Sequence, residues 1–310
     1  MDRILPTGDL AIKKVLASEE NKDVLAGLIE DFFDVVVEDL TIVNPYSIAA
    51  YREFNKSGEI AILRQTINDV AATFRTADFV SEAQIQKSSF FDERSLLYPL
   101  ERFCGNYNKV GHMKTDSQGR PIRYSSLRPV YSLNILGYTH FPEDDEALRI
   151  FELYDAKRNK RFKKDYLRIG YFELTKGKVE TQRQRYWHDY FNTGEVDPEA
   201  PEYIRKASRV IEFSNLTKEE LNMARTLERA QAIYDADMYG SYIEGVAEGE
   251  ARGKAEGKAE GKAEGKAEGK AEGKAEGIEL LAGFLREGMS VEEALRKAME
   301  SIELKDTKPE

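Results

Sequence analysis

Two acidic residues, Asp69 and Glu82, are spaced so that they can act together on a metal ion. The sequence around them is typical of two short strands, over residues 67–74 and 79–85, joined by a tight turn at residues 75–76. In that hairpin, residues whose numbers sum to 151 lie opposite each other, as 69 and 82 do. Cross-strand neighbours have Cβ atoms about 4.5–5.5 Å apart. Because two like charges at that distance repel, the pair predicts a hard divalent cation between them, Mg²⁺ with Mn²⁺ as a substitute.

Gln84 lies on the same face of the second strand as Glu82, because side chains alternate along a strand. A metal ion held there polarises a phosphoryl oxygen and lowers the pKa of a bound water, which is the chemistry of phosphodiester hydrolysis. The Gln84 amide can orient that water or a phosphate oxygen, but it carries no charge and is not a base. Spacing alone leaves a simpler interpretation open, in which Asp69 and Glu82 are solvated side chains on a surface hairpin.

The elements around this hairpin indicate an α/β fold with a sheet covered by helices. The expected helices span residues 9–16, 21–37 and 89–107, and further strands span residues 129–138 and 166–174. The apolar face of the third helix is expected to consist of Phe90, Phe91, Leu96, Leu97, Leu100 and Phe103. Asp9 is interpreted as the N-terminal cap of the first helix in preference to a third acid near the metal.

Composition narrows the class of protein. The chain has 310 residues and a net charge of −10, which argues against a protein that coats nucleic acid. The single cysteine, Cys104, excludes an internal disulfide framework and a cysteine-based zinc site. The three histidines lie far apart, and no run of about 20 apolar residues or secretory signal is present. We therefore expect a reduced, soluble, cytoplasmic protein without a membrane partner.

The C-terminal part is expected to be helical. A capping box at Thr217 begins a long helical pattern, and the aromatic cluster around Trp187 before it is interpreted as core packing. Lys254-Ala255-Glu256-Gly257 recurs six times in register, ending at Gly277. This low-complexity repeat predicts a marginal, solvated helix that serves as a spacer, since each Gly costs about 1 kcal/mol relative to Ala. A second capping box at Ser290 begins the last helix of a short hairpin, which we interpret as a docking or self-association element.

The chain resembles the recombination-promoting nuclease and transposase family of the PD-(D/E)xK nuclease superfamily. The resemblance rests on segments that occur in the family's order over nearly the whole chain. These are residues 6–16 and 18–22, Asn68-Asp69-Val70, Glu82-Ala83-Gln84, and residues 91–98, 128–136 and 172–176. The Lys/Glu/Ala tail punctuated by glycine is also typical of the family.

The resemblance implies a restriction-endonuclease-like core, a mixed sheet flanked by helices, that cuts DNA with Mg²⁺. It implies a DNA endonuclease of low sequence specificity, linked to recombination or transposition. Asp69 and Glu82 would be the metal ligands, and Gln84 would occupy the place of the superfamily's lysine. Asparagine instead of proline precedes Asp69, and the lysine is absent. The alternative is therefore a degenerate nuclease fold that binds DNA or protein without cutting.

Two basic segments are expected to contact the phosphates of DNA. One is the run from residue 157 to 164, and the other is the loop from residue 109 to 128. The predicted DNA-binding residues are Lys157, Arg158, Lys160, Arg161, Lys163, Lys164, Arg120 and Arg123. Lys13 and Lys14 are further candidates.

Four parts follow along the chain. We expect a nuclease-like core over residues 1–175, a helical extension over 176–240, the repeat spacer over 241–277 and the helical hairpin over 278–310.

Overall fold

The computed structural model describes residues 3–44, 46 and 70–306. The predicted metal ligand Asp69 and the start of the first predicted strand, residues 67–69, lie outside the described residues. The chain divides into two compact units, Met1–Glu228 and Arg229–Glu310, each of which is described by itself. The four-part division expected from the sequence stays a prediction.

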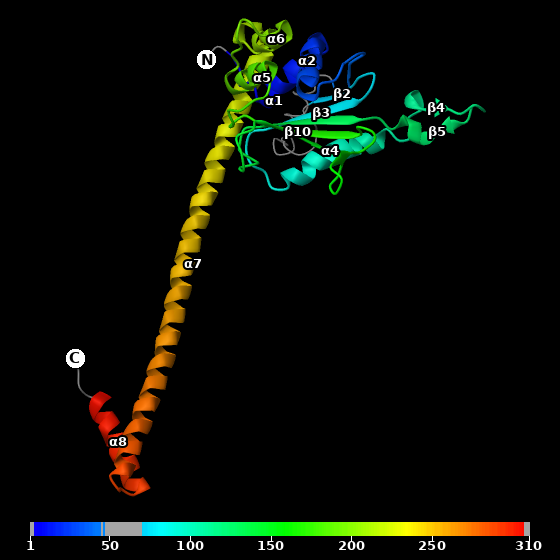
Figure 1. The fold of residues 1–310 in the computed structure, drawn as a ribbon. Helices are drawn as coiled ribbons and strands as arrows, with labels where there is room; N and C mark the ends of the chain where they lie inside the picture. Colours follow the sequence, from blue (N-terminus) through cyan, green and yellow to red (C-terminus); the bar gives the residue numbers. More distant parts are fainter. Residues whose placement is uncertain (1–2, 45, 47–69, 307–310) are drawn as a thin grey trace. The chain divides into compact units, whose positions relative to one another are not determined.

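The first unit contains a six-stranded mixed sheet in the order β1-β2-β3-β6-β10-β7 (Figure 1). Its strands are β1 (Thr41–Ile42), β2 (Val70–Thr73), β3 (Asp78–Gln84), β6 (Val130–Leu136), β10 (Leu167–Glu173) and β7 (Leu148–Glu152). The central strand β6 runs parallel to both β3 and β10, whereas the other pairs are antiparallel. This mixed sheet flanked by helices is the predicted α/β restriction-endonuclease-like fold. Strand β7 was not expected from the sequence.

The hairpin of β2 and β3 has the predicted register. Val70 pairs with Ser81 and Thr73 pairs with Asp78, so paired numbers sum to 151. β3 is displaced by one residue from the expected span and ends at Gln84. The register rule on which the acidic pair was predicted is confirmed for the described residues 70–81.

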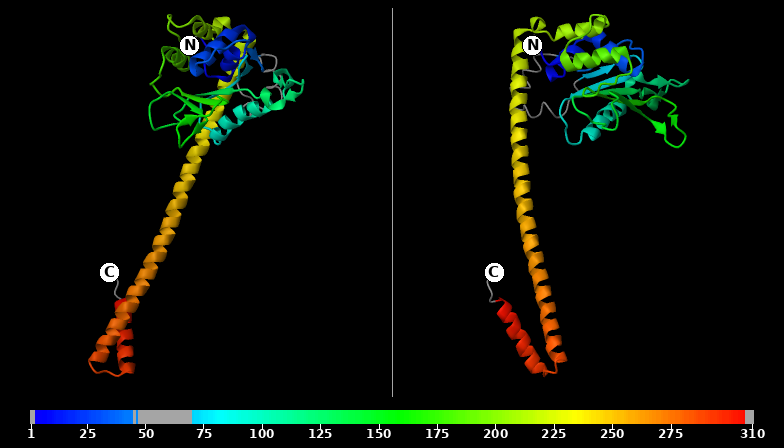
Figure 2. Two further views of the ribbon diagram at one scale, coloured as in Figure 1. Left: turned by 45° about the vertical axis from the view of Figure 1, so that its right-hand side comes forward. Right: turned by 60° about the vertical axis from the view of Figure 1, so that its left-hand side comes forward.

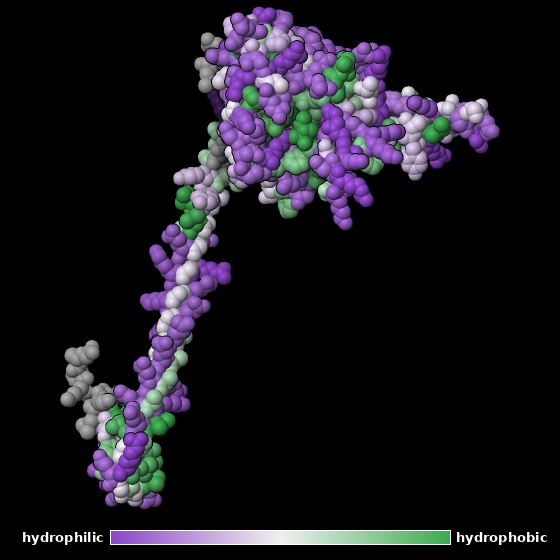
Figure 3. Space-filling view, viewed as in Figure 1, coloured by the Kyte–Doolittle hydropathy of each residue, from purple (hydrophilic) through white to green (hydrophobic). Residues whose placement is uncertain are grey.

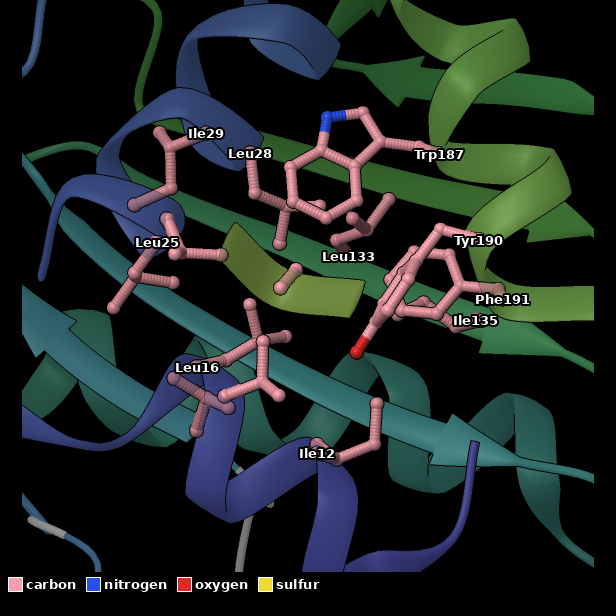
Figure 4. Packing of buried hydrophobic residues seen from close by; sticks show 14 of the residues in the cluster. Ile12, Leu16, Leu25, Leu28, Ile29, Leu133, Ile135, Trp187, Tyr190 and Phe191 are labelled. Atoms are coloured by element: carbon pink, nitrogen blue, oxygen red, sulfur yellow. The ribbon is translucent and has the colours of Figure 1, made fainter. Parts of the chain in front are cut away.

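On one face of the sheet, three helices lie over the strands and a fourth, α6, packs against these helices, and together they enclose the main core (Figures 1 and 4). They are α1 (Asp9–Leu16), α2 (Lys22–Phe33), α5 (Gln182–Thr193) and α6 (Glu202–Val210), with the short 3₁₀ helices η1 (Glu19–Asn21) and η5 (Phe213–Asn215) beside them. Figure 4 shows Trp187, Tyr190 and Phe191 packed toward Leu133 and Ile135 of β6. The aromatic cluster is therefore core, as predicted.

Two details of the first helices differ from expectation. Asp9 is not a cap, because the N-cap is Gly8 and Asp9 is the first helical residue, 3.5 Å from Lys13 one turn later. A carboxylate in the first turn interacts favourably with the positive end of the helix dipole. α2 ends at Phe33 rather than near residue 37, because Asp34 adopts a left-handed conformation (φ 51°) that stops the helix.

Helix α4 (Phe91–Gly105) covers the opposite face of the sheet (Figure 1). The predicted apolar face is wrong, because Leu96, Leu97 and Leu100 are exposed. The buried residues of the helix are Phe91, Ser95 and Pro99. Phe91 and Phe103 pack against apolar side chains of the strands. Between and beside them, Arg94, Ser95 and Arg102 make hydrogen bonds to the strands, so the leucines of α4 do not form its contact with the sheet.

The described residues of this unit also form two small hairpins and two further 3₁₀ helices, which the sequence did not predict. They are β4 (Lys114–Thr115) with β5 (Pro121–Ile122), β8 (Tyr154–Asp155) with β9 (Lys160–Arg161), η3 (Val110–His112) and η4 (Arg123–Ser126).

The helix α7 (Lys218–Arg286) begins at the predicted capping box and runs through the whole repeat. Thr217 accepts a hydrogen bond from the Glu220 amide (3.2 Å), and Glu220 accepts one from the Thr217 amide (2.8 Å). Gly288, with φ 89°, follows its end, and α8 (Val291–Asp306) begins after Ser290, which accepts from the Glu293 amide (3.3 Å). Figure 2 shows this succession of helices. Self-association through them stays a prediction.

The repeat segment of α7 carries mainly hydrophilic side chains (Figure 3). No helix in the described part of the chain combines the length and the apolar character needed to cross a membrane.

Candidate active site

Glu82 belongs to a row of side chains that crosses the sheet on the face covered by α4. Strand pairing places Glu82 of β3 beside Asn134 of β6, Asn134 beside Tyr171 of β10, and Tyr171 opposite Arg149 of β7. Because paired residues project from the same face, these four form one row. The face is the α4 side, since Tyr171 packs in a cluster with Phe91 of that helix.

Arg94, from the first turns of α4, connects the two predicted catalytic side chains of β3. Its Nη2 donates to Glu82 Oε1 at 2.8 Å and to Gln84 Oε1 at 2.7 Å. The side chain of Glu82 is 15% exposed, and its second oxygen, Oε2, is buried with no hydrogen-bond partner among the described residues. Glu82 therefore keeps a carboxylate oxygen that no described group satisfies.

Burial is the main influence on the pKa of Glu82. Removal from water raises the pKa of its carboxyl above the ordinary value, and the nearby Arg94 guanidinium opposes that rise only in part. A proton therefore competes with a cation for Glu82 more strongly than it would at a solvent-exposed carboxylate.

Hydrogen bonds fix the position of the groups around Glu82. Ser95 Oγ lies 2.7 Å from the Tyr171 hydroxyl, which joins α4 to the row one residue after Arg94. Asn134 Nδ2 donates to the carbonyl of Gly170 at 3.1 Å, and Gln84 Nε2 donates to the carbonyl of Gln86 at 2.8 Å. The Gln84 amide is thus oriented at both ends, with its oxygen toward Arg94.

The segment that follows β6 closes over the same end of the strands. The amides of His140 and Phe141 donate to the fully buried Glu173 at 2.6 and 3.1 Å, and Lys176 pairs with Glu173 at 2.8 Å. Burial, with nearby carboxylates that include Asp92 and Glu82, raises the pKa of Tyr138 to about 12. The Tyr138 hydroxyl therefore stays protonated at neutral pH.

At this end of the sheet, two backbone segments approach so closely that residue 137 must be glycine. The Gly137 amide donates to the Gln84 carbonyl at 3.0 Å, and a Cβ at residue 137 would lie 2.9 Å from the Ile85 carbonyl oxygen. Gly137 thereby holds the end of β3, where Gln84 projects, against the end of β6.

Glu82 fits the role of a cation ligand, because carboxylate oxygens are what hard cations prefer and Oε2 has no described partner. The described residues contain no cluster of three or more His, Cys, Asp or Glu arranged to hold a metal ion. The second predicted ligand, Asp69, lies outside the described residues.

The predicted DNA-binding residues fall into two groups. Three arginines pair with carboxylates: Arg120 with Asp116, Arg158 with Asp155 and Arg161 with Glu152. The rest are exposed, with no ion pair in the described part of the chain: Arg123, Lys157, Lys160, Lys163 and Lys164. Of the further candidates, Lys14 pairs with Glu220 at 2.6 Å and Lys13 with Asp9, so both have structural partners.

Residues 6–242 match the family model of PD-(D/E)XK nuclease family transposases. The chain belongs to this family. Its members generally use divalent metal ions, and a nuclease of this family has DNA as its substrate. Neither the curated proteins nor the solved structures include a significant match to this family member.

Arg94 is the functional candidate that the sequence analysis missed. One signal was available, because Arg94 lies in the first turns of a helix, where the dipole disfavours a cation. A basic residue there indicates a carboxylate from another element nearby, and Glu82 is that carboxylate.

Proposed function

We propose that this protein is a metal-dependent DNA endonuclease of low sequence specificity that acts in recombination or transposition. In this proposal Asp69 and Glu82 hold Mg²⁺, for which Mn²⁺ substitutes, and Gln84 orients a water or a phosphate oxygen. The observation that carries it is the Glu82 carboxylate, with one oxygen on Arg94 and the other buried without a described partner.

The bound metal ion supplies a polarised phosphoryl oxygen and a water of lowered pKa. Arg94 supplies the positive charge that Gln84, in the place of the superfamily's lysine, lacks. A guanidinium is charged at all relevant pH values and binds phosphate oxygens through charge-assisted hydrogen bonds. With Glu82 bound to a cation instead of to Arg94, the guanidinium would be free to turn toward a phosphate of the DNA.

Exposed cations hold the DNA backbone in this proposal. Lys157, Lys160, Lys163, Lys164 and Arg123 neutralise phosphates without reading bases, which is the expected basis of low sequence specificity. The arginines that pair with Asp116, Asp155 and Glu152 contribute less, because their charge is already compensated.

The competing function is a degenerate nuclease fold that binds DNA or a partner protein without cutting. Two observations favour it: glutamine stands in the place of the lysine, and Arg94 occupies one oxygen of Glu82. An arginine that served only to neutralise Glu82 would give the same contact.

Cleavage of supercoiled plasmid with Mg²⁺ and then Mn²⁺ separates the two functions. We expect Glu82→Gln and Arg94→Ala each to reduce the nicking rate about 10²–10³-fold, since each removes a group that stabilises developing charge. Arg94→Lys should retain part of the rate, because it keeps the charge. The matched control is Arg75→Ala, which removes an exposed arginine that pairs with Glu38 at the hairpin turn.

Unchanged nicking in Glu82→Gln would place the activity elsewhere. Equal nicking in wild type and Arg94→Ala would remove Arg94 from the mechanism. No nicking by the wild type with either metal, together with DNA binding, would support the degenerate module.

A further inference from the structure

The segment between α4 and β6 presents aromatic rings and positive charge away from the core. This segment, residues 107–127, is called the arm; it contains η3, β4, β5 and η4. Figures 1 and 2 show β4 and β5 projecting from the body of the sheet. The described core clusters include none of its side chains. Its apolar residues therefore have no role in the packing of the core.

Two tyrosines meet at the base of the arm. The rings of Tyr107 and Tyr124 have centroids 5.1 Å apart with an angle of 50° between their planes. The two residues are 44% and 74% exposed. Exposure of this extent leaves ring faces open to a flat ligand. The two tyrosines do not bury each other, so their contact is not a small hydrophobic core.

The charge around the two rings is positive. Lys109, Lys114 and Arg123 are exposed, and no ion pair involves them in the described residues. The only acidic residue of the arm, Asp116, is paired with Arg120 at 2.8 Å. An anionic ligand with flat aromatic groups is complementary to this surface.

We infer that the arm is a stacking platform for unpaired nucleotides, with bases on Tyr107 and Tyr124 and phosphates on Lys109, Lys114 and Arg123. Base–aromatic stacking together with a basic track is the physical basis of single-stranded DNA binding. In a duplex the faces of the bases are stacked on one another, so a duplex can interact with the cations of the arm but not with its aromatic rings. The inference rests on the proposed function and gives it a substrate class: DNA that contains a single-stranded segment.

Fluorescence anisotropy in EDTA tests the platform without cleavage, using the full chain and one labelled 20-nucleotide strand, alone or as a duplex. We expect Tyr124→Ala to weaken single-strand binding about tenfold and to change duplex binding less than twofold. Tyr124→Phe should bind as the wild type does, because it keeps the ring. Lys114→Ala should weaken the binding of both DNAs equally, because it removes a phosphate contact. Tyr239→Ala, which removes an exposed tyrosine of the second unit, is the matched control.

A second readout comes from Tyr124→Trp, whose exposed indole should be quenched by the single strand and not by the duplex, while the buried Trp187 gives a constant background. An unchanged ratio of the two affinities in Tyr124→Ala, or equal quenching by both DNAs, overturns the platform. Nicking that depends on Glu82 would then still stand. Conversely, loss of the proposed nuclease function would leave the Tyr124-dependent binding of single strands in place.

Discussion

At the scale of single residues, the site depends on one carboxylate held in an environment that disfavours its charge. Glu82 gains one guanidinium contact from Arg94, yet the loss of water around it has the larger effect on its pKa. A buried charge with an unsatisfied oxygen lowers stability and is retained where a ligand compensates it. The cost of burying Glu82 is therefore consistent with a cation site.

The raised pKa of Glu82 predicts how Glu82→Gln changes stability with pH. The folded protein binds a proton at Glu82 more firmly than the unfolded chain does. The contribution of Glu82 to stability is therefore greatest below about pH 4.5, the ordinary pKa of the group, and it is lost as the pH rises through the folded-state pKa. At pH 8 in EDTA we expect Glu82→Gln to be more stable than wild type, and at pH 4 equal to it. Each tenfold increase in proton affinity corresponds to about 1.4 kcal/mol.

Urea unfolding at the two pH values measures this difference. In an Arg94→Ala background the gain from Glu82→Gln at pH 8 should be larger, because the cation that opposes the effect of burial is absent. A variant less stable than wild type at pH 8 would show that the contact with Arg94 outweighs desolvation.

At the scale of elements, α4 is attached to the sheet by polar contacts at both of its ends. Arg94 and Ser95 contact the row that contains Glu82, and Arg102 and Asn106 reach the other end of β3. There Asp78 is fully buried, and its Oδ2 accepts from Arg102 Nε and Asn106 Nδ2, each at 2.8 Å. Asp78 therefore determines how α4 lies over the strand that carries Glu82 and Gln84.

We predict that Asp78→Ala lowers the free energy of unfolding by about 3–5 kcal/mol. The substitution leaves the half-buried Arg102 and Arg128 without the carboxylate that compensates them, and breaking a buried ion pair has this cost. Arg120→Ala, which removes the exposed arginine of the pair with Asp116 on the arm, should leave stability unchanged. Denaturant titration of both variants tests the prediction, and a loss below about 1 kcal/mol for Asp78→Ala would contradict it.

The same helix shows what the sequence could and could not predict. The hairpin register, β6, β10, α1, the capping box at Thr217 and the helix start after Ser290 follow from alternation and capping signals, because those signals are local. The buried face of α4 does not, since its polar residues are buried only by partners on distant strands, such as Tyr171 and Asp78. Arg94 was missed for that reason, as its role depends on a carboxylate twelve residues away in another element. β7 and the two small hairpins were missed because their strands are short and mostly exposed.

At the scale of the whole molecule, the chain joins a sheet-based unit with a buried core to a helical unit with little core of its own. The repeat is helical although every fourth residue is glycine. Its period of four also places Lys next to Lys and Glu next to Glu on successive turns, which repel each other. Stability of this helix therefore depends on intrinsic propensity and is low beside that of the core.

Replacing four repeat glycines by alanine tests whether the stability of the repeat helix depends on intrinsic helix propensity. A Cβ added at Gly257, Gly261, Gly265 or Gly269 would meet no atom within 4 Å, so Gly→Ala there has no steric cost. Each replacement favours the helix by about 1 kcal/mol. We expect the fourfold variant to gain ellipticity at 222 nm and to lose it at higher temperature than wild type.

The core should not respond to these replacements. Trp187, the single tryptophan, is buried in the first unit, and its fluorescence reports the unfolding of that unit alone. We expect this transition to keep its midpoint in the fourfold variant and in the control Ala259→Gly, which should lower ellipticity instead. A shift of the Trp187 transition in step with the helix would mean that the two units unfold together, and the repeat would then be a structural part of the nuclease rather than a spacer.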